Sequence, residues 1–270
     1  MKVTAIIKKV TDDSKSGMIA FIVIALVFGT LSVVFFPAVK QSGIDLAQIM
    51  KSIPPELTKA LGIANTNLAE FNNYIATRYL GVFGLVAFAP FVLSWAGRIA
   101  QDAEAGTLAL ILAYPVTRSQ VFLAHYSALL VKTGYLVLIV LLSVLLPAVL
   151  IGESFSLVNW LIYALILFVF LGAIGSVTIL AAVLLQSKSK AMAAGGAFLA
   201  AGYFTQLFSQ LVPQLADLKY FSLMYYYGEP ASILRDGSIN ATSLLLLLLI
   251  AALGFVSALI IFRRKDLPAG

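Results

Sequence analysis

The chain has 270 residues, of which 61% are hydrophobic and 11% are charged, whereas a soluble domain carries about 25% charged residues. Too few charges remain to cover a globular surface, and a mean hydropathy of +1.00 agrees, so the composition predicts a polytopic membrane protein. The net charge of +6 is not read as affinity for nucleic acid. The absence of cysteine excludes disulfides, a thiolate nucleophile and a cysteine-ligated metal.

Six uncharged stretches are long enough to cross a bilayer, which takes about 20 residues. They are Gly17–Val39, Tyr79–Gly97, Thr133–Gly152, Asn159–Leu185, Ala191–Ala216 and Ser238–Phe262. The second stretch is slightly short and must borrow a turn from its flanks. We therefore expect an all-α fold with six transmembrane helices, forming one membrane domain over residues 1–270.

The distribution of basic residues predicts the orientation. With the N-terminus inside, 11 of the 18 Lys and Arg residues lie in the inner segments and six in the outer ones, with Lys132 between them. Because basic residues concentrate on the cytosolic side of membrane proteins, both termini are expected to be cytosolic.

Two connecting segments are predicted to form amphipathic helices. In residues 1–17, Val3, Ile6, Ile7 and Val10 share a helical stripe surrounded by lysines, a pattern typical of a helix lying in the membrane interface. The outer segment, residues 41–78, contains "SIPPELTKALG", which reads as a short helix. A second helix is expected to follow in this segment, with Asn67 as its N-cap and Glu70 three residues later.

The search for catalytic or nucleotide-binding motifs finds none. There is no phosphate-binding loop, no nucleophile elbow, and too few histidines for a zinc-protease motif. His125 is expected to be an interfacial residue satisfied by lipid headgroups, although a proton site is the alternative. Lys132 is expected to snorkel to the cytosolic interface, with a functional role as its alternative. No carboxylate lies within a predicted span, which counts against an ion-coupled carrier.

The cytosolic segment 98–120 carries the most informative pattern. Glu104 and Gly106 are expected to end one helix and turn the chain, with Gly106 at positive φ. The stretch Thr107–Tyr114 then forms about two helical turns, with Leu108, Ile111 and Leu112 on one face, until Pro115 stops it. Thr117 and Gln120 form a capping box for the next helix. The sequence thus predicts a short, rigid helix between the second and third spans.

This segment, "EAGTLALILAYPVTRSQVFL", resembles the E-G-T-L-x-x-L-L-x-x-P-V-S-R pattern of type-2 ABC transporter permeases, the six-span membrane subunits of many bacterial exporters. The amphipathic helix before the first span, the "PPEL…LG" stretch and "FSLMYYYGEPASILRDG" before the last span agree with that family. Two departures stand out: Ala105 separates Glu104 from Gly106, and Ala124-His125 replaces a common Gly-Lys pair.

The resemblance implies a permease subunit in the bacterial plasma (inner) membrane. It would pair with a second permease subunit, as a homodimer or heterodimer, through the first and fifth spans, and would be seated on two copies of a separate ABC ATPase subunit. ATP and magnesium would bind to that partner, so this chain would hold no cofactor and would itself be no enzyme. The substrate expected is hydrophobic or amphipathic, exported by means of the partner's ATP hydrolysis.

The same resemblance makes the short helix the coupling helix that docks on the ATPase. The coupling residues expected are Glu104, Gly106, Thr107, Leu108, Ile111 and Arg118. Tyr225, Tyr226 and Tyr227, between the fifth and sixth spans, would either gate the exit or simply anchor in the interface. A secondary transporter or channel without an ATPase partner remains the alternative function.

Overall fold

The computed structural model describes residues 15–41 and 67–265, and every regular element in this part of the chain is a helix. In chain order the elements are α2 (Lys15–Gln41), α5 (Phe71–Ile75), the π-helix η1 (Ala76–Leu80), α6 (Val82–Ala96), α7 (Arg98–Glu104), α8 (Thr107–Leu112), α9 (Arg118–Leu150), α10 (Leu157–Leu185), α11 (Lys188–Leu211), the 3₁₀-helix η2 (Pro213–Phe221), α12 (Leu223–Tyr227), α13 (Pro230–Asp236) and α14 (Ala241–Arg264). The predicted all-α class is confirmed. The predicted interfacial helix falls mainly in residues 1–14 and, like the helix expected over 52–62, lies outside the described residues.

Five helices of the described part are long and apolar enough to cross a membrane: α2, α9, α10, α11 and α14. The second predicted span is different, because α6 has 15 residues and spans only about 22 Å at 1.5 Å per residue, less than the bilayer core of about 30 Å. It becomes long enough when Phe71–Leu80 is added across a bend of 47°. By length and composition, then, the chain is a multi-pass membrane protein, with five candidate spans within residues 15–41 and 67–265, or six if the bent pair is one.

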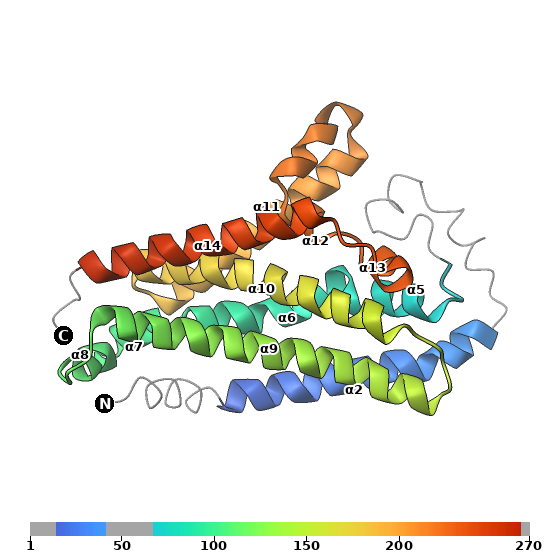
Figure 1. Ribbon diagram of the computed structural model, residues 1–270, viewed down its shortest axis with the longest axis horizontal. Helices are drawn as coiled ribbons and strands as arrows, with labels where there is room; N and C mark the ends of the chain where they lie inside the picture. The colour runs from blue at the N-terminus through green and yellow to red at the C-terminus, as the bar shows by residue number, and fades with distance from the viewer. Residues whose placement is uncertain (1–14, 42–66, 266–270) are drawn as a thin grey trace.

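The long helices form a bundle around α10. Figure 1 shows α2, α9, α10 and α14 running along the long axis of the molecule, with α2 beginning and α14 ending toward the end that carries α8. Of the apolar window of α10, 78% is buried inside the chain, and α10 packs against α6, α9, α11 and most extensively against α14. Its nearly uniform apolar sequence fits this central place, because a helix covered on all sides needs no polar face.

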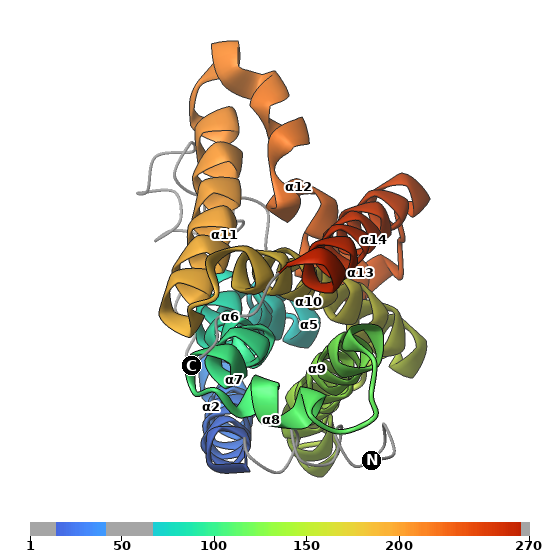
Figure 2. The same ribbon diagram turned by 90° about the vertical axis from the view of Figure 1, so that its left-hand side faces the viewer.

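Helix α11 leaves the bundle. Figure 2 shows it rising away from the other long helices, with η2 at its far end and α12 returning beside it. Only 17% of its apolar window is buried. The helix ends at Leu211, earlier than the predicted Ala216, because Val212 is extended, as the residue before a proline prefers to be, and Pro213 follows.

Two other helix starts bear on the predictions. Helix α9 begins at Arg118, directly after the predicted cap Thr117, and continues unbroken, so the third span and the segment before it form one 33-residue helix. Helix α5 begins at Phe71 with Glu70 at its N-cap position, so the prediction that Asn67 caps it is wrong. The Asn67 side chain instead accepts a hydrogen bond from the Ala69 backbone N–H at 3.1 Å, closing a local turn that competes with the helix.

Small residues bring α11 close to its neighbours at its base. A Cβ atom added to Gly195 would lie 2.2 Å from Oγ1 of Thr178 on α10 and 2.7 Å from Leu93 on α6. Any side chain here would force the helices apart, so glycine permits their close approach. The "AMAAGGAFLAAGYF" stretch of α11 thus packs against helices of the same subunit at this position.

The orientation predicted from the charges can be tested because the chain has no cysteine. Ser189, in the first turn of α11, and Ser238, just before α14, are both exposed. We expect Ser238→Cys to react with a membrane-impermeant thiol reagent in intact cells, and Ser189→Cys to react only after the membrane is opened. The unsubstituted chain is the control, and labelling of Ser189→Cys from outside would reverse the predicted orientation.

Candidate functional site

The segment from α7 to the start of α9 lies at one end of the bundle, called here the α8 end. Figure 2 looks onto this end and shows α8 crossing between α7 and α9. Gly106 has φ 69°, in the left-handed region, as predicted, and so turns the chain from α7 into α8 where other residues would be strained. The predicted capping box is also confirmed, with Gln120 N donating to Thr117 Oγ1 and Thr117 N donating to Gln120 Oε1.

The side chains that α8 exposes to solvent are not the ones predicted to dock on a partner. Leu108 and Ile111 are only 1% and 5% exposed, so their side chains pack into the chain itself. Leu110 and Tyr114 are 69% and 57% exposed and form the free apolar surface of this short segment. The interpretation of Leu108 and Ile111 as side chains that a partner buries is therefore corrected, because the turn at Gly106 points them inward.

The two predicted charged residues of the segment bind neighbouring helices. The Glu104 carboxylate accepts a hydrogen bond of 3.2 Å from the backbone N–H of Lys188, in the first turn of α11. A carboxylate is favoured there because the first N–H groups of a helix have no partner within it. At the other side of α8, Arg118 donates to the backbone carbonyl of Lys265, just after α14. Both side chains thus tie the α8 segment to other helices of the same chain.

Thr107 also holds the turn together. Its hydroxyl donates to the backbone carbonyl of Asp102, on α7, at 3.0 Å. Because this bond spans the turn at Gly106, it fixes the direction in which α8 leaves α7.

A buried charge cluster joins α7 to α9. Nε2 of His125 lies 2.9 Å from one carboxylate oxygen of Asp102, and Nε of Arg98 donates to the other oxygen at 3.2 Å. Nδ1 of His125 lies 2.9 Å from the Val121 carbonyl, so both ring nitrogens face oxygen acceptors. His125 and Asp102 are 3% and 7% exposed.

The environment of Asp102 favours its ionised form. Burial by itself disfavours the carboxylate charge, but the hydrogen bond from His125 and the charges of His125 and Arg98 outweigh that effect and hold the pKa of Asp102 below its usual value. Sequence reasoning missed Asp102 altogether. Its partner is 23 residues away, and nothing in the local pattern distinguishes Asp102 from the exposed Glu104.

Two sequence-based interpretations of α9 are corrected. His125 binds Asp102 and a backbone carbonyl inside the chain, not lipid headgroups. Lys132 was expected to reach the interface, yet it is 1% exposed and counts among the largest fully buried side chains. Its position in the middle of a packed helix thus does not fit snorkelling.

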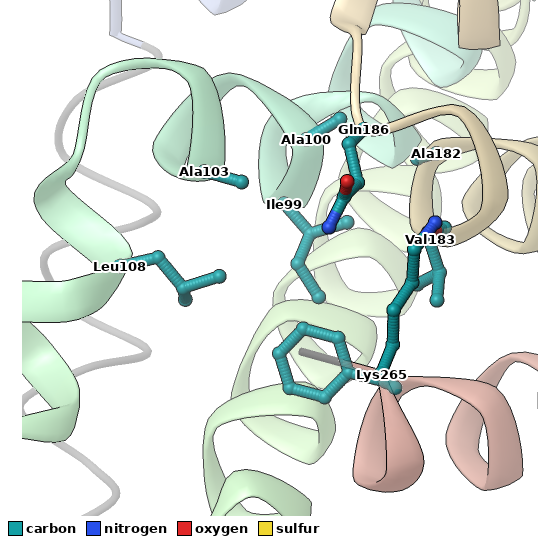
Figure 3. A pocket seen from close by; sticks show the side chains of 9 residues that line it. Ile99, Ala100, Ala103, Leu108, Ala182, Val183, Gln186 and Lys265 are labelled. Atoms are coloured by element: carbon teal, nitrogen blue, oxygen red, sulfur yellow. The ribbon is translucent and has the colours of Figure 1, made fainter. Parts of the chain in front are cut away.

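A narrow apolar seam separates α7 and α8 from the ends of α10 and α14. Figure 3 shows Leu108 and Ile99 facing Val183 and Lys265 across it. Its free volume of about 10 Å³ is no more than one water needs. Lys265 closes one side by donating from Nζ to the carbonyls of Val183 and Leu184 at the end of α10. The seam is a packed joint between helices, too small for a substrate.

The three tyrosines predicted as a gate lie toward the opposite end of the bundle, called here the α13 end. They do not share one surface. Tyr227 is buried, and its hydroxyl lies 2.7 Å from that of Tyr163. The Tyr226 hydroxyl donates to the Tyr220 carbonyl at 2.6 Å, and the ring of Tyr225 meets that of Tyr220 edge-on. Tyr227 is thus a core residue of the bundle, while Tyr225 and Tyr226 pack toward η2.

Comparisons with known proteins identify no relative: no family model and no curated protein matches the chain. Within residues 15–41 and 67–265, no group of three or more His, Asp and Glu side chains is arranged to hold a metal ion. The helices and their apolar lengths define the class of protein, an all-helical multi-pass membrane protein.

Proposed function

We propose that the chain is the membrane permease subunit of an ATP-driven ABC exporter, moving a hydrophobic or amphipathic substrate with energy from a separate ATPase subunit. The observation that carries this proposal is α8, a six-residue helix held between α7 and α9 at one end of the bundle. It exposes the large apolar side chain of Leu110, and Tyr114 is exposed just after the helix. A leucine and a tyrosine facing solvent together are a suitable surface for a partner.

The contacts of the α8 segment support a coupling role. Through Asp102 and His125 the segment is joined to α9, through Glu104 to α11, and through Arg118 to α14. Gln101 adds a second link to α11 by accepting from Nζ of Lys188 at 2.9 Å. A push on α8 would thus reach three long helices through hydrogen bonds, and coupling between sites travels through such contiguous networks.

The partners follow from this role. Two copies of an ABC ATPase would each receive one α8 segment, and ATP and magnesium would bind there, so no cofactor is assigned to this chain. A second permease subunit, identical or different, would complete the complex in the bacterial plasma membrane. The α8 end and both termini would face the cytosol, and no nucleic acid is expected to bind.

Gly106→Val tests the coupling directly. Open space surrounds the position of the missing Cβ, so the variant should fold and keep its ATPase, but valine resists the φ of 69°. We expect α8 to be misdirected and hydrolysis to continue without transport. ATPase activity and transport would be measured together in proteoliposomes, with Gly17→Val, also in open space, as the control. Transport at the unsubstituted rate would show that the direction of α8 does not matter.

The second candidate function is a secondary transporter or channel without an ATPase. The buried Asp102–His125 pair favours it, since such pairs can carry protons. The two functions differ in their energy source. With the ATPase present in proteoliposomes, the proposed exporter stops when ATP is replaced by a non-hydrolysable analogue and is unaffected by a protonophore. The reverse pattern would favour the second candidate.

A further inference from the structure

An open pocket of about 290 Å³ lies at the α13 end and is lined by residues from α10, α12, α13 and the start of α14. These helices are labelled in Figure 1. Its lining includes the polar residues Glu229, Ser232 and Ser243 and the aromatic residues Tyr226 and Tyr227. It also includes the apolar residues Ile166, Ile233, Leu244 and Leu247. The pocket therefore combines polar and apolar lining groups.

Glu229 is the acidic residue of this pocket, and its carboxylate is little used by the protein. It stands at the N-cap position of α13 without capping that helix through its side chain. The hydroxyl of Ser232 donates to it at 3.2 Å. Within the described residues it forms no ion pair, and Arg235, on the same helix, is bound by Asp236 in two hydrogen bonds from Nε and one from Nη2.

The aromatic rings add to the preference for a cation. An ammonium group is attracted to a tyrosine face as well as to a carboxylate. Tyr227 is fixed by its hydroxyl contact with Tyr163 and by the ring of Phe170, 4.5 Å away between centroids. Tyr226 is fixed by its bond to the Tyr220 carbonyl. Both rings therefore line the pocket from defined positions, which lowers the cost of ordering them on binding.

The apolar lining of the pocket suits a hydrocarbon tail on the ligand. From Asn240, the N-cap of α14, to Leu247 the helix descends about 10 Å, so the pocket reaches from the capped end of a span into its apolar part. Leu247 is fully buried, whereas Leu244 is partly exposed. A hydrocarbon chain lying along Leu244, above the buried Leu247, would continue into the bilayer.

We propose that this pocket binds an amphipathic amine, with its ammonium group beside Glu229 and Tyr226 and its hydrocarbon tail along Leu244. The ligand is either an aminophospholipid of the membrane or a soluble long-chain amine, which share this chemistry. Binding needs only this chain, and that the ligand is also the exported substrate rests on the proposed function.

The test uses the full chain purified in a nonionic detergent and a dodecylamine probe with a photoreactive diazirine in its tail. We expect crosslinks to the start of α14, and about tenfold weaker labelling in Glu229→Gln, as for loss of a hydrogen-bonded charge. Ser243→Trp should also block labelling, by filling the pocket while leaving Glu229 in place. Asp217→Asn, which removes an exposed carboxylate on η2 outside this pocket, should label normally.

Two further arms separate the ligand sources and the type of contact. Native mass spectrometry with added phosphatidylethanolamine or phosphatidylglycerol should show retention of the amine lipid by the unsubstituted chain, and its loss in Glu229→Gln, if the source is the membrane. If dodecylamine labels the chain but no lipid is retained, the ligand is assigned as a soluble amine. The proposal is overturned if the matching dodecanol probe labels as strongly as the amine, or if both pocket variants label normally. Because no ATPase is present, either result leaves the coupling role of α8 untouched.

Discussion

Replacing Leu110 and Tyr114 together with aspartate is expected to abolish co-purification of the ATPase subunit while leaving the membrane bundle intact. Both side chains are more than half exposed, so charges placed there remain in water and cost the fold little. A partner that buries such side chains gains about 1.5–3 kcal/mol from each, and losing both lowers the affinity by more than about a hundredfold. The measurement is a pull-down of the ATPase, followed by size-exclusion chromatography of the variant.

The buried side of the same helix provides the contrast. Leu108→Asp places an unpaired charge where the native side chain is 1% exposed, which costs several kcal/mol, so this variant should lose its folded state as well as its partner. Leu110→Phe with Tyr114→Phe keeps the surface apolar and should retain the ATPase. If the double aspartate variant binds the ATPase as well as the unsubstituted chain does, α8 is not the docking surface.

Asp102→Asn is expected to cause a large loss of stability at the α8 end. It leaves His125 and Arg98 without their carboxylate. Removing one partner of a buried ion pair typically lowers the free energy of unfolding by about 3–5 kcal/mol. Thermal unfolding in nonionic micelles would measure the loss. Glu104→Gln is the matched control, because Glu104 is exposed and accepts a single backbone hydrogen bond. A variant as stable as this control would show that the cluster does not hold α7 to α9.

The pH dependence of stability gives an independent check on Asp102. Because its pKa is lowered in the folded chain, its contribution is fully present above the ordinary value of 3.8 and is lost as the pH falls through the lower folded value. Unfolding measured as the medium is acidified below that ordinary value should therefore show a steeper loss of stability in the unsubstituted chain than in Asp102→Asn. Parallel curves would mean that Asp102 does not stabilise the fold through its charge.

Local signals in the sequence predicted local structure well. The spacing of Thr117 and Gln120 located the start of α9 to the residue, and Gly106 indicated a turn at positive φ. Counting uncharged residues, however, began the third span only at Thr133, whereas the helix that carries it runs unbroken from Arg118. The uncharged run is cut short by Lys132, whose charge looks incompatible with a buried helix, and only the folded chain shows that this side chain is buried.

What the sequence could not predict depends on contacts between distant segments. The apolar stripe of α8 was recognised, but whether Leu108 or Leu110 turns inward depends on the neighbouring ends of α10 and α14. The pair of Asp102 and His125, and the pocket around Glu229, likewise bring together side chains from different helices. Neither helical periodicity nor charge counting contains that information.

The central position of α10 has a consequence for biogenesis. Helices α2, α6 and α9 are synthesised first and contact one another, so they can associate in the bilayer as a partial bundle. Helix α14 makes its most extensive contact with α10, and the base of α11 also lies against it through Gly195. Insertion of α10 is therefore the step that divides early from late assembly, and a chain halted before Leu157 would leave a groove open to lipid or to membrane chaperones.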